Sequence, residues 1–247
     1  MSATIADDTE IQGEQGRLPM SHWVAITWML ALRTFRLRYL RSRLGVGWAL
    51  IQPVIQTVVL AFMFTRIFKV AGVPHYPLYV LSGVMTWQAF QTSVASSTTS
   101  AVENSALLKK VDMPGLVFPL SQVLAVMLVY GVQLIVLVIL AAVSGTLGLK
   151  VFLLIPVALL VAASAAGLGC LTCAFHVAYR DVKFLVDAGL LLTFYATPIL
   201  YDPARVPEHL RHLLALNPMY GVESLARAAV LDRPVDIGSL WLGGATT

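Results

Sequence analysis

The chain has 247 residues, of which 58% are hydrophobic and only 12% are charged, and its mean hydropathy is +0.79. Soluble domains carry roughly 25% charged residues, so this composition excludes a soluble domain and predicts an integral membrane protein. The net charge of +4 and the pI near 9.2 do not indicate nucleic-acid binding. The basic residues gather at the ends of apolar segments, where membrane orientation and lipid headgroups explain them.

The chain begins with a polar, acidic stretch that lacks the apolar core of a signal peptide. We expect residues 1–20 to form a disordered cytoplasmic tail and residues 21–247 to form a single membrane domain. The interval 21–44 is predicted to be an amphipathic helix in the headgroup plane. Its apolar stripe comprises Val24, Trp28, Ala31, Phe35 and Tyr39. Anchoring to the membrane and docking of a cytosolic partner explain this helix equally well.

Five later segments are apolar over about the 20 residues that a spanning helix needs. They are approximately 47–68, 77–94, 116–143, 151–177 and 184–200. A sixth span starts near residue 237 and stops at Thr247, so we expect it to be truncated. The intervening segment 201–236 is predicted to be external.

The charge distribution predicts a cytoplasmic N-terminus, because Lys and Arg concentrate in cytoplasmic loops. Five arginines lie between residues 33 and 43, just before the first span, and further basic residues follow the second and fourth spans. The loop 103–114 also carries apolar residues and a proline stop. Apolar side chains on a cytoplasmic loop suggest a surface for a partner protein.

No metal site or catalytic constellation is evident in the sequence. The histidines are scattered, and the two cysteines, Cys170 and Cys173, lie in an Ala/Gly-rich apolar run that suggests helix packing. No nucleotide-binding glycine loop is present. Asp187 is the only acidic residue within the spans, and Lys183 is spaced to pair with it. We therefore predict no cofactor in this chain and an energy source in another subunit.

Amide and aromatic side chains recur within the spans instead of charges. Rings can stack on the C–H faces of sugars and amides can bond hydroxyl groups, so these residues are candidates for a glycan path. Packing between helices is the alternative explanation for each of them. The predicted path residues are Gln52, Gln56, Trp87, Phe90, Gln91, Phe194, Tyr195 and Tyr201.

Several segments together resemble the permease subunits of type-2 ABC exporters, the class that moves O-antigen, capsule and teichoic acid glycans. The matching segments are 38–53, 103–114, 179–183, 197–201 and 216–220. The resemblance implies an all-α, six-span permease with an N-terminal interface helix. It also implies a second copy of the chain, two copies of a separate ATPase that binds ATP and Mg²⁺, and a lipid-linked glycan in the inner membrane of a bacterium.

The same resemblance implies two groups of site residues. The ATPase would contact the interface helix, a coupling helix within 103–114 and the loop at 179–181. The implied coupling residues are Arg36, Arg38, Tyr39, Arg41, Glu103, Asn104, Leu107, Leu108, Lys109, Lys110, Val111, Tyr179, Arg180 and Asp181. Short helices that re-enter the outer leaflet would form an external gate, with Pro198, Asn217, Pro218 and Tyr220 at its breaks.

Two other functions remain open at this point. One is an ABC permease for a small drug or antibiotic, which would share the fold and the energy source. The other is a membrane-embedded enzyme acting on polyprenyl-linked sugars, for which Asp181 with His176 is the nearest approach to a catalytic pair.

Overall fold

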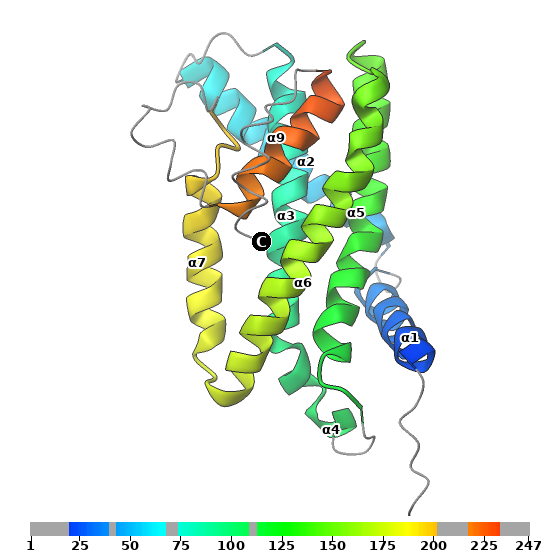
Figure 1. Ribbon diagram of the computed structural model, residues 1–247. Helices are drawn as coiled ribbons and strands as arrows, with labels where there is room; N and C mark the ends of the chain where they lie inside the picture. Colours follow the sequence, from blue (N-terminus) through cyan, green and yellow to red (C-terminus); the bar gives the residue numbers. More distant parts are fainter. Residues whose placement is uncertain (1–19, 40–42, 68–73, 109–112, 202–216, 233–247) are drawn as a thin grey trace, which may run out of the picture.

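The computed structural model describes residues 20–39, 43–67, 74–108, 113–201 and 217–232, and these residues form helices and turns without a strand. Figure 1 shows a bundle of long helices with α1 lying beside its lower part, next to α5. The segments predicted at 1–20 and from residue 237 onward fall almost entirely outside the described residues. The all-helical prediction is confirmed for the described part of the chain.

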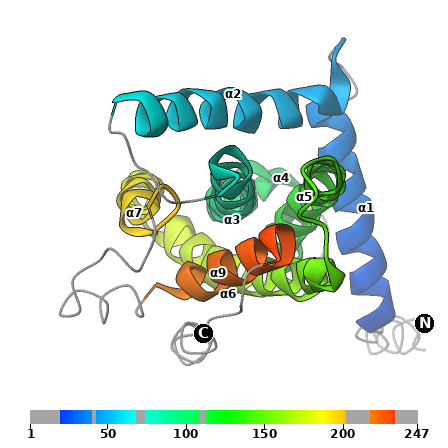
Figure 2. The ribbon, with the colours of Figure 1, turned by 90° about the horizontal axis from the view of Figure 1, so that it is seen from above.

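The centre of the bundle is α3 (Tyr76–Glu103), with five other helices around it (Figures 1 and 2). These are α2 (Trp48–Phe62), α5 (Val117–Val143), α6 (Leu154–Ala178), α7 (Val182–Ala196) and α9 (Pro218–Leu231). Most residues of α3 are buried, including Tyr79, Met85 and Trp87. The chain therefore has one core, and α3 runs through it.

Hydroxyl groups join α3 to its neighbours. The bonds link Thr98 to Thr172 (2.7 Å between hydroxyl oxygens), Thr86 to Tyr130 (2.9 Å) and Ser97 to the Pro119 carbonyl (3.0 Å). Gly169 of α6 lies so close to α3 that a Cβ there would come within 2.7 Å of the Ser97 Cβ. The hydroxyl-rich end of α3 therefore packs between helices, which is the alternative that the sequence left open for it.

Three of the five predicted spans are long and apolar enough to cross a membrane. They are 45–67, 117–143 and 149–178, and they agree with the predicted boundaries to within a few residues. α3 extends nine residues beyond its predicted end at 94, because the Ser/Thr-rich stretch stays helical within the core. The polar side chains of this stretch explain why α3 is not among the three helices that are apolar enough to cross a membrane. α7 has only 15 residues.

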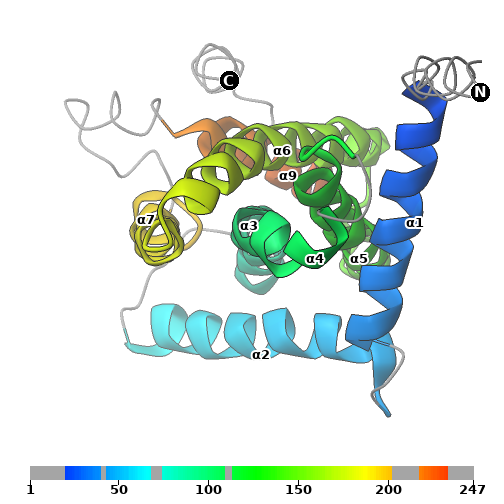
Figure 3. The ribbon, with the colours of Figure 1, turned by 90° about the horizontal axis from the view of Figure 1, so that it is seen from below.

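The first helix, α1 (Met20–Tyr39), runs roughly perpendicular to α3 and crosses the lower end of α5 (Figures 1 and 3). The predicted apolar stripe is only partly correct. Thr27 and Ala31 are buried, whereas Val24 is 65% exposed and Trp28 is 45% exposed. The small side chains allow α1 to approach α5, so the packed face is rotated away from the larger apolar residues.

The turns of the bundle alternate between two ends. α1, α4 (Ser105–Leu108) and the α6–α7 turn lie at the lower end, while the α5–α6 turn and most of α9 lie toward the upper end (Figures 1 and 3). The described parts of the segments predicted to face the cytoplasm therefore lie at one end. Helix α9, which is the main described part of the region predicted to be external, lies toward the other end.

Candidate conduit and coupling surface

A cavity of about 550 Å³ lies between α2, α3 and α7. We call it the glutamine–aromatic pocket. It is lined by Gln52, Gln56, Trp87, Gln88, Gln91, Thr92, Ala95, Ser96, Leu191, Phe194 and Tyr195. Six of the eight predicted path residues thus share one cavity, although they come from three separate helices.

Helical spacing explains why these residues meet. Gln52 and Gln56 are four residues apart and share a face of α2, as do Gln88 and Thr92 on α3. Phe194 and Tyr195 occupy the last turn of α7. Each helix therefore contributes one polar or aromatic stripe, and the three stripes converge.

Hydrogen bonds and ring contacts fix the wall of the pocket. Gln88 donates to the Gln56 side-chain carbonyl at 2.7 Å, so α3 and α2 are joined across the pocket wall. The Trp87 indole N–H donates to the Gln91 side-chain oxygen at 2.9 Å. Ring centroids lie 6.0 Å apart for Trp87 and Phe194, and 5.2 Å apart for Phe194 and Tyr195. These distances suit tilted aromatic pairs.

The lining residues of the pocket differ in how much of each side chain is exposed. Trp87 is 1% exposed, whereas Tyr195 is 65% exposed. Trp87 therefore supports the wall, and Tyr195 presents its ring and hydroxyl on the open side. No lining residue carries a charge, so the pocket offers amide, hydroxyl and aromatic groups to an occupant.

A second cavity, of about 280 Å³, extends from this pocket toward the lower end. It shares Gln52, Gln88 and Thr92 with the glutamine–aromatic pocket and reaches Arg38 and Tyr39 of α1. Gln133 of α5 also lines it and donates to the Ala49 carbonyl at 2.8 Å. A polar track thus connects the end of α1 to the pocket. Gln88 and Gln133 are not among the path residues predicted from the sequence.

Phe90 and Tyr201 lie outside the pocket. Phe90 is buried and contacts Trp87 at 5.6 Å between ring centroids, with its other side facing a mainly apolar cavity beside α6 and α7. Tyr201 lies in the turn after α7, toward the upper end. Burial raises the pKa of the Tyr201 phenol, and the positive charge of Arg227 acts in the opposite direction.

The predicted gate residues gather around the start of α9. Asn217 is the N-cap of this helix, since its side-chain oxygen accepts from the Met219 N–H at 3.0 Å, and Pro218 follows at the first helical position. The Asn217 amide donates to the Thr197 hydroxyl at 2.6 Å, beside Pro198. The Tyr220 N–H donates to the Asn217 carbonyl at 3.0 Å. Two segments 20 residues apart in sequence therefore meet here.

The predicted coupling residues that the structure describes lie at the lower end (Figure 3). Arg36, Arg38 and Glu103 are exposed, and so are Tyr179, Arg180 and Asp181. Leu107, Leu108 and Tyr39 are half-buried, and the Asn104 side chain caps α3 by donating to the Ser100 carbonyl at 2.8 Å. Arg41, Lys109, Lys110 and Val111 lie outside the described residues.

A cavity of about 420 Å³ separates α1 from the lower ends of α3 and α5. Arg33, Arg38, Glu103, Asn104 and Gln122 line it. Charged groups of both signs therefore surround a recess on the predicted cytoplasmic side.

Two sequence predictions about charges need correction. Lys183 and Asp187 are both exposed and form no ion pair; among the described residues the ion pair present is Lys150–Asp232. Glu223 and Arg227, which were not predicted to be buried, are 0% and 5% exposed in α9. Their i,i+4 spacing was visible, but such pairs usually lie on a solvated helix face.

The enzyme alternative finds no support in the geometry. His176 is buried and Asp181 is exposed, and the structure brings no third acidic, histidine or cysteine residue to them within the described part of the chain. Cys170 and Cys173 are free thiols.

Comparison with known proteins identifies the family. Residues 26–231 match the model of the ABC-2 type transporter family. The chain is 29% identical to the O-antigen export system permease protein RfbA of Klebsiella pneumoniae over 189 residues, covering 76% of this chain and 73% of the relative. It is also 29% identical to the permease of the same name from Myxococcus xanthus over 193 residues, with 77% and 74% coverage. The chain therefore belongs to the ABC-2 type transporter family, as a membrane permease and not an enzyme.

Proposed function

We propose that the chain is the permease subunit of an exporter that carries a lipid-linked cell-envelope polysaccharide across the inner membrane of a bacterium. The observation that carries this proposal is the glutamine–aromatic pocket, where six predicted path residues meet. The names of the relatives, which are O-antigen export permeases, support the same class of substrate.

The chemistry of the pocket fits an uncharged sugar chain. The rings of Phe194 and Tyr195 offer faces for the C–H surfaces of sugars, while Gln52 and Gln91 offer amides for hydroxyl groups. Neutral groups bind a passing polymer weakly enough to release it, because no buried ion pair has to be broken at each step.

An exposed polar stripe supports a second copy of the chain. Gln52, Thr92 and Tyr195 are exposed in the single protomer, and exposing amides and hydroxyl groups to hydrocarbon is unfavourable. A second copy related by two-fold symmetry would cover this open side and complete the conduit. The six-span arrangement with a cytoplasmic N-terminus is part of the same proposal.

The energy would come from two copies of a separate ATPase that bind ATP and Mg²⁺. Their docking surface would be the lower end of the bundle, where α1, α4 and the α6–α7 turn lie together. Exposed Arg36, Arg38 and Arg180 would orient the encounter. Because the ATPase dimer changes shape with its nucleotide, its differential binding would shift the conformation of the permease.

Tyr195→Ala tests the conduit. Tyr195 is 65% exposed and lines the pocket, whereas Leu192 is 71% exposed on the same helix and does not line it. We expect Tyr195→Ala to lower glycan export by about threefold to tenfold, the effect of losing one aromatic stacking contact. Leu192→Ala should leave export and membrane abundance unchanged.

Equal export by the two variants would contradict the conduit. Affinity purification of the full chain from native membranes tests the energy source independently. Co-purification of a nucleotide-binding subunit in equal amount would support the exporter. Recovery of the chain without such a subunit would contradict it.

A further inference from the structure

The turn 197–201 receives hydrogen bonds from side chains of distant elements. This turn follows the C-terminal end of α7, where helix carbonyls lack partners within the helix. The Tyr76 hydroxyl donates to the Leu200 carbonyl at 2.8 Å, and the Tyr79 hydroxyl donates to the Tyr201 carbonyl at 2.9 Å. Both tyrosines belong to the first turn of the central helix α3.

The same turn is held from its other side by α9. Arg227 donates to the Pro198 carbonyl, and its guanidinium carbon lies 3.9 Å from the centre of the Tyr79 ring. Asn217 donates to the Thr197 hydroxyl at 2.6 Å. We call Tyr76, Tyr79, Asn217 and Arg227, together with the turn, the external clamp. It joins α3, α7 and α9 at one point.

Glu223 lies one helical turn before Arg227 on α9. It is completely buried, and its carboxylate oxygens have no hydrogen-bond partner among the described residues. A Cβ at Gly83 would lie 3.1 Å from Glu223 Oε2 and 3.5 Å from Arg227 Nη2. Both groups therefore face the space left by Gly83 on α3. The two side chains are neighbours but form no ion pair, and the partner of the Arg227 guanidinium is the Pro198 carbonyl.

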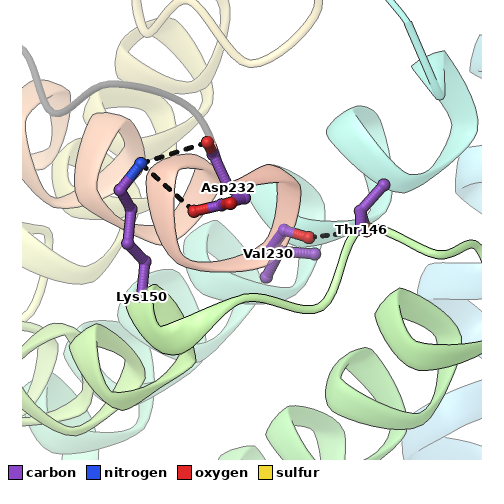
Figure 4. Close-up of polar contacts among 4 residues, drawn as sticks. All are labelled: Thr146, Lys150, Val230 and Asp232. Atoms are coloured by element: carbon purple, nitrogen blue, oxygen red, sulfur yellow. Dashed lines mark hydrogen bonds and ion pairs between the residues drawn. The ribbon is translucent and has the colours of Figure 1, made fainter.

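The helix that carries Arg227 is itself anchored at its other end (Figure 4). Lys150 pairs with the Asp232 carboxylate at 3.1 Å and donates to the Asp232 carbonyl at 3.1 Å. The Thr146 hydroxyl donates to the Val230 carbonyl at 2.9 Å. α9 therefore bridges the α5–α6 turn and the turn after α7, and so its position is fixed by both.

α7 packs against α3 and α6 but is far less buried than α3. Leu190 is the one buried residue among the 15 of this helix, whereas α3 is buried along most of its length. The last turn of α7 carries Phe194 and Tyr195, directly before the clamped turn. The clamp therefore fixes the end of α7 that lines the glutamine–aromatic pocket.

We propose that Arg227, supported by Glu223, is a positioning residue that fixes α7 and thereby places Phe194 and Tyr195 in the pocket. The contacts of the external clamp support the first part of this proposal, that Arg227 fixes α7. Its consequence for transport rests on the proposed function.

Spin-label mobility tests the fastening of α7 directly. The full chain is reconstituted in liposomes with Cys170 and Cys173 replaced by Ala, and a nitroxide is attached to Leu192→Cys on α7. A matched label at Leu159→Cys reports on α6, where Leu159 is 66% exposed, close to the 71% of Leu192. The test variant is Arg227→Lys, which keeps the charge beside Glu223 but loses the planar donor fork.

We expect the ratio of mobile to immobile label at position 192 to rise about tenfold, the effect of losing one hydrogen bond from a charged donor. The label at position 159 should not change. An unchanged spectrum at 192, or equal changes at both positions, would overturn the proposal. If Arg227→Lys does not fold, Tyr79→Phe serves instead: it loses the bond to the Tyr201 carbonyl, keeps the ring under Arg227, and should give a smaller rise at 192.

Glycan export measured in the same variants separates the two proposals. A loosened α7 with normal export would leave the clamp standing and contradict the role of Phe194 and Tyr195 in the conduit. Lost export with an immobile α7 would overturn the clamp as the way in which Arg227 acts.

Discussion

The two ends of this molecule treat their charged residues in opposite ways. At the upper end, Arg227 is buried against Tyr79 and the Pro198 carbonyl, and Lys150 pairs with Asp232. At the lower end, Arg36, Arg38 and Arg180 are exposed. The charged residues of α9 and of the α5–α6 turn make contacts within the chain, although Arg66 is exposed, whereas the described charges of the lower end point outward. Charge that is used internally maintains the fold, and charge that is presented outward remains available for a partner.

The largest expected effect comes from removing the buried guanidinium. Arg227→Met removes the bond to the Pro198 carbonyl and the contact with the Tyr79 ring, so we expect the free energy of unfolding to fall by about 2–5 kcal/mol. Arg227→Met combined with Glu223→Gln should recover part of this loss, because no buried carboxylate is then left without a positive charge nearby. Thermal unfolding of the detergent-solubilised protein measures both. A double variant no more stable than the single one would show that the side chains of Glu223 and Arg227 do not interact.

A smaller loss is expected where α6 approaches α3. Gly169→Ala places a methyl group 2.7 Å from the Ser97 Cβ, so we expect an overpacking cost of about 1–3 kcal/mol. Gly167→Ala is the matched control, since a Cβ there meets nothing within 4 Å. The same unfolding measurement should separate the two alanines, and equal stabilities would show that the helices can move apart without cost.

A charge reversal at the lower end should weaken docking without affecting the fold. Arg180→Glu is expected to lower the affinity for the ATPase subunit by about tenfold, through loss of charge complementarity. Arg66→Glu makes the same change in charge at an exposed site after α2, toward the upper end, and should leave the affinity unaltered. Co-purification at increasing salt measures the difference. If both reversals weaken binding equally, the lower end is not the docking surface.

The smallest effect is expected at the exposed ion pair of the upper end. The side chains of Lys150 and Asp232 are 38% and 52% exposed, and such pairs contribute about 0–1 kcal/mol. Lys150→Met should therefore change the free energy of unfolding by less than Gly169→Ala does. A larger loss would mean that α9 depends on this anchor more than on its buried contacts.

Much of the fold could be predicted from composition and periodicity. Apolar length located the spans at 47–68, 116–143 and 151–177 to within a few residues, because a hydrocarbon layer selects for continuous apolar helices. The resemblance implied a break at Asn217 and Pro218, and the structure begins α9 there, with Asn217 as the N-cap and Pro218 at the first helical position.

What could not be predicted depends on contacts between distant segments. Opposite charges four residues apart, such as Glu223 and Arg227, give the same pattern on a solvated helix as in a core. Their burial follows from Gly83 on another helix. The rotation of α1 was missed for a similar reason, because close packing against α5 selected Thr27 and Ala31 over the larger Val24 and Trp28.

The residues predicted for the pocket include both correct and incorrect predictions. Residue type grouped Gln52, Gln91 and Tyr195, which line one pocket, but it could not distinguish them from Phe90, which packs within the core. Local spacing determines which residues share a face of a helix. Which face turns toward the pocket is determined by how the helices pack.

Gly83 carries no functional group, yet its substitution should have a clear effect in a genetic screen. The glutamate and arginine of α9 fit against α3 because position 83 has no side chain, so Gly83→Ala should behave in a mutant screen like a defect in the charged pair itself. Glu223→Asp, which withdraws the carboxylate by one methylene, should suppress the defect only in part, because the new Cβ would also lie 3.1 Å from Ile199. A residue with no charge and no donor would thus belong to the same epistatic group as the two most deeply buried charges of α9.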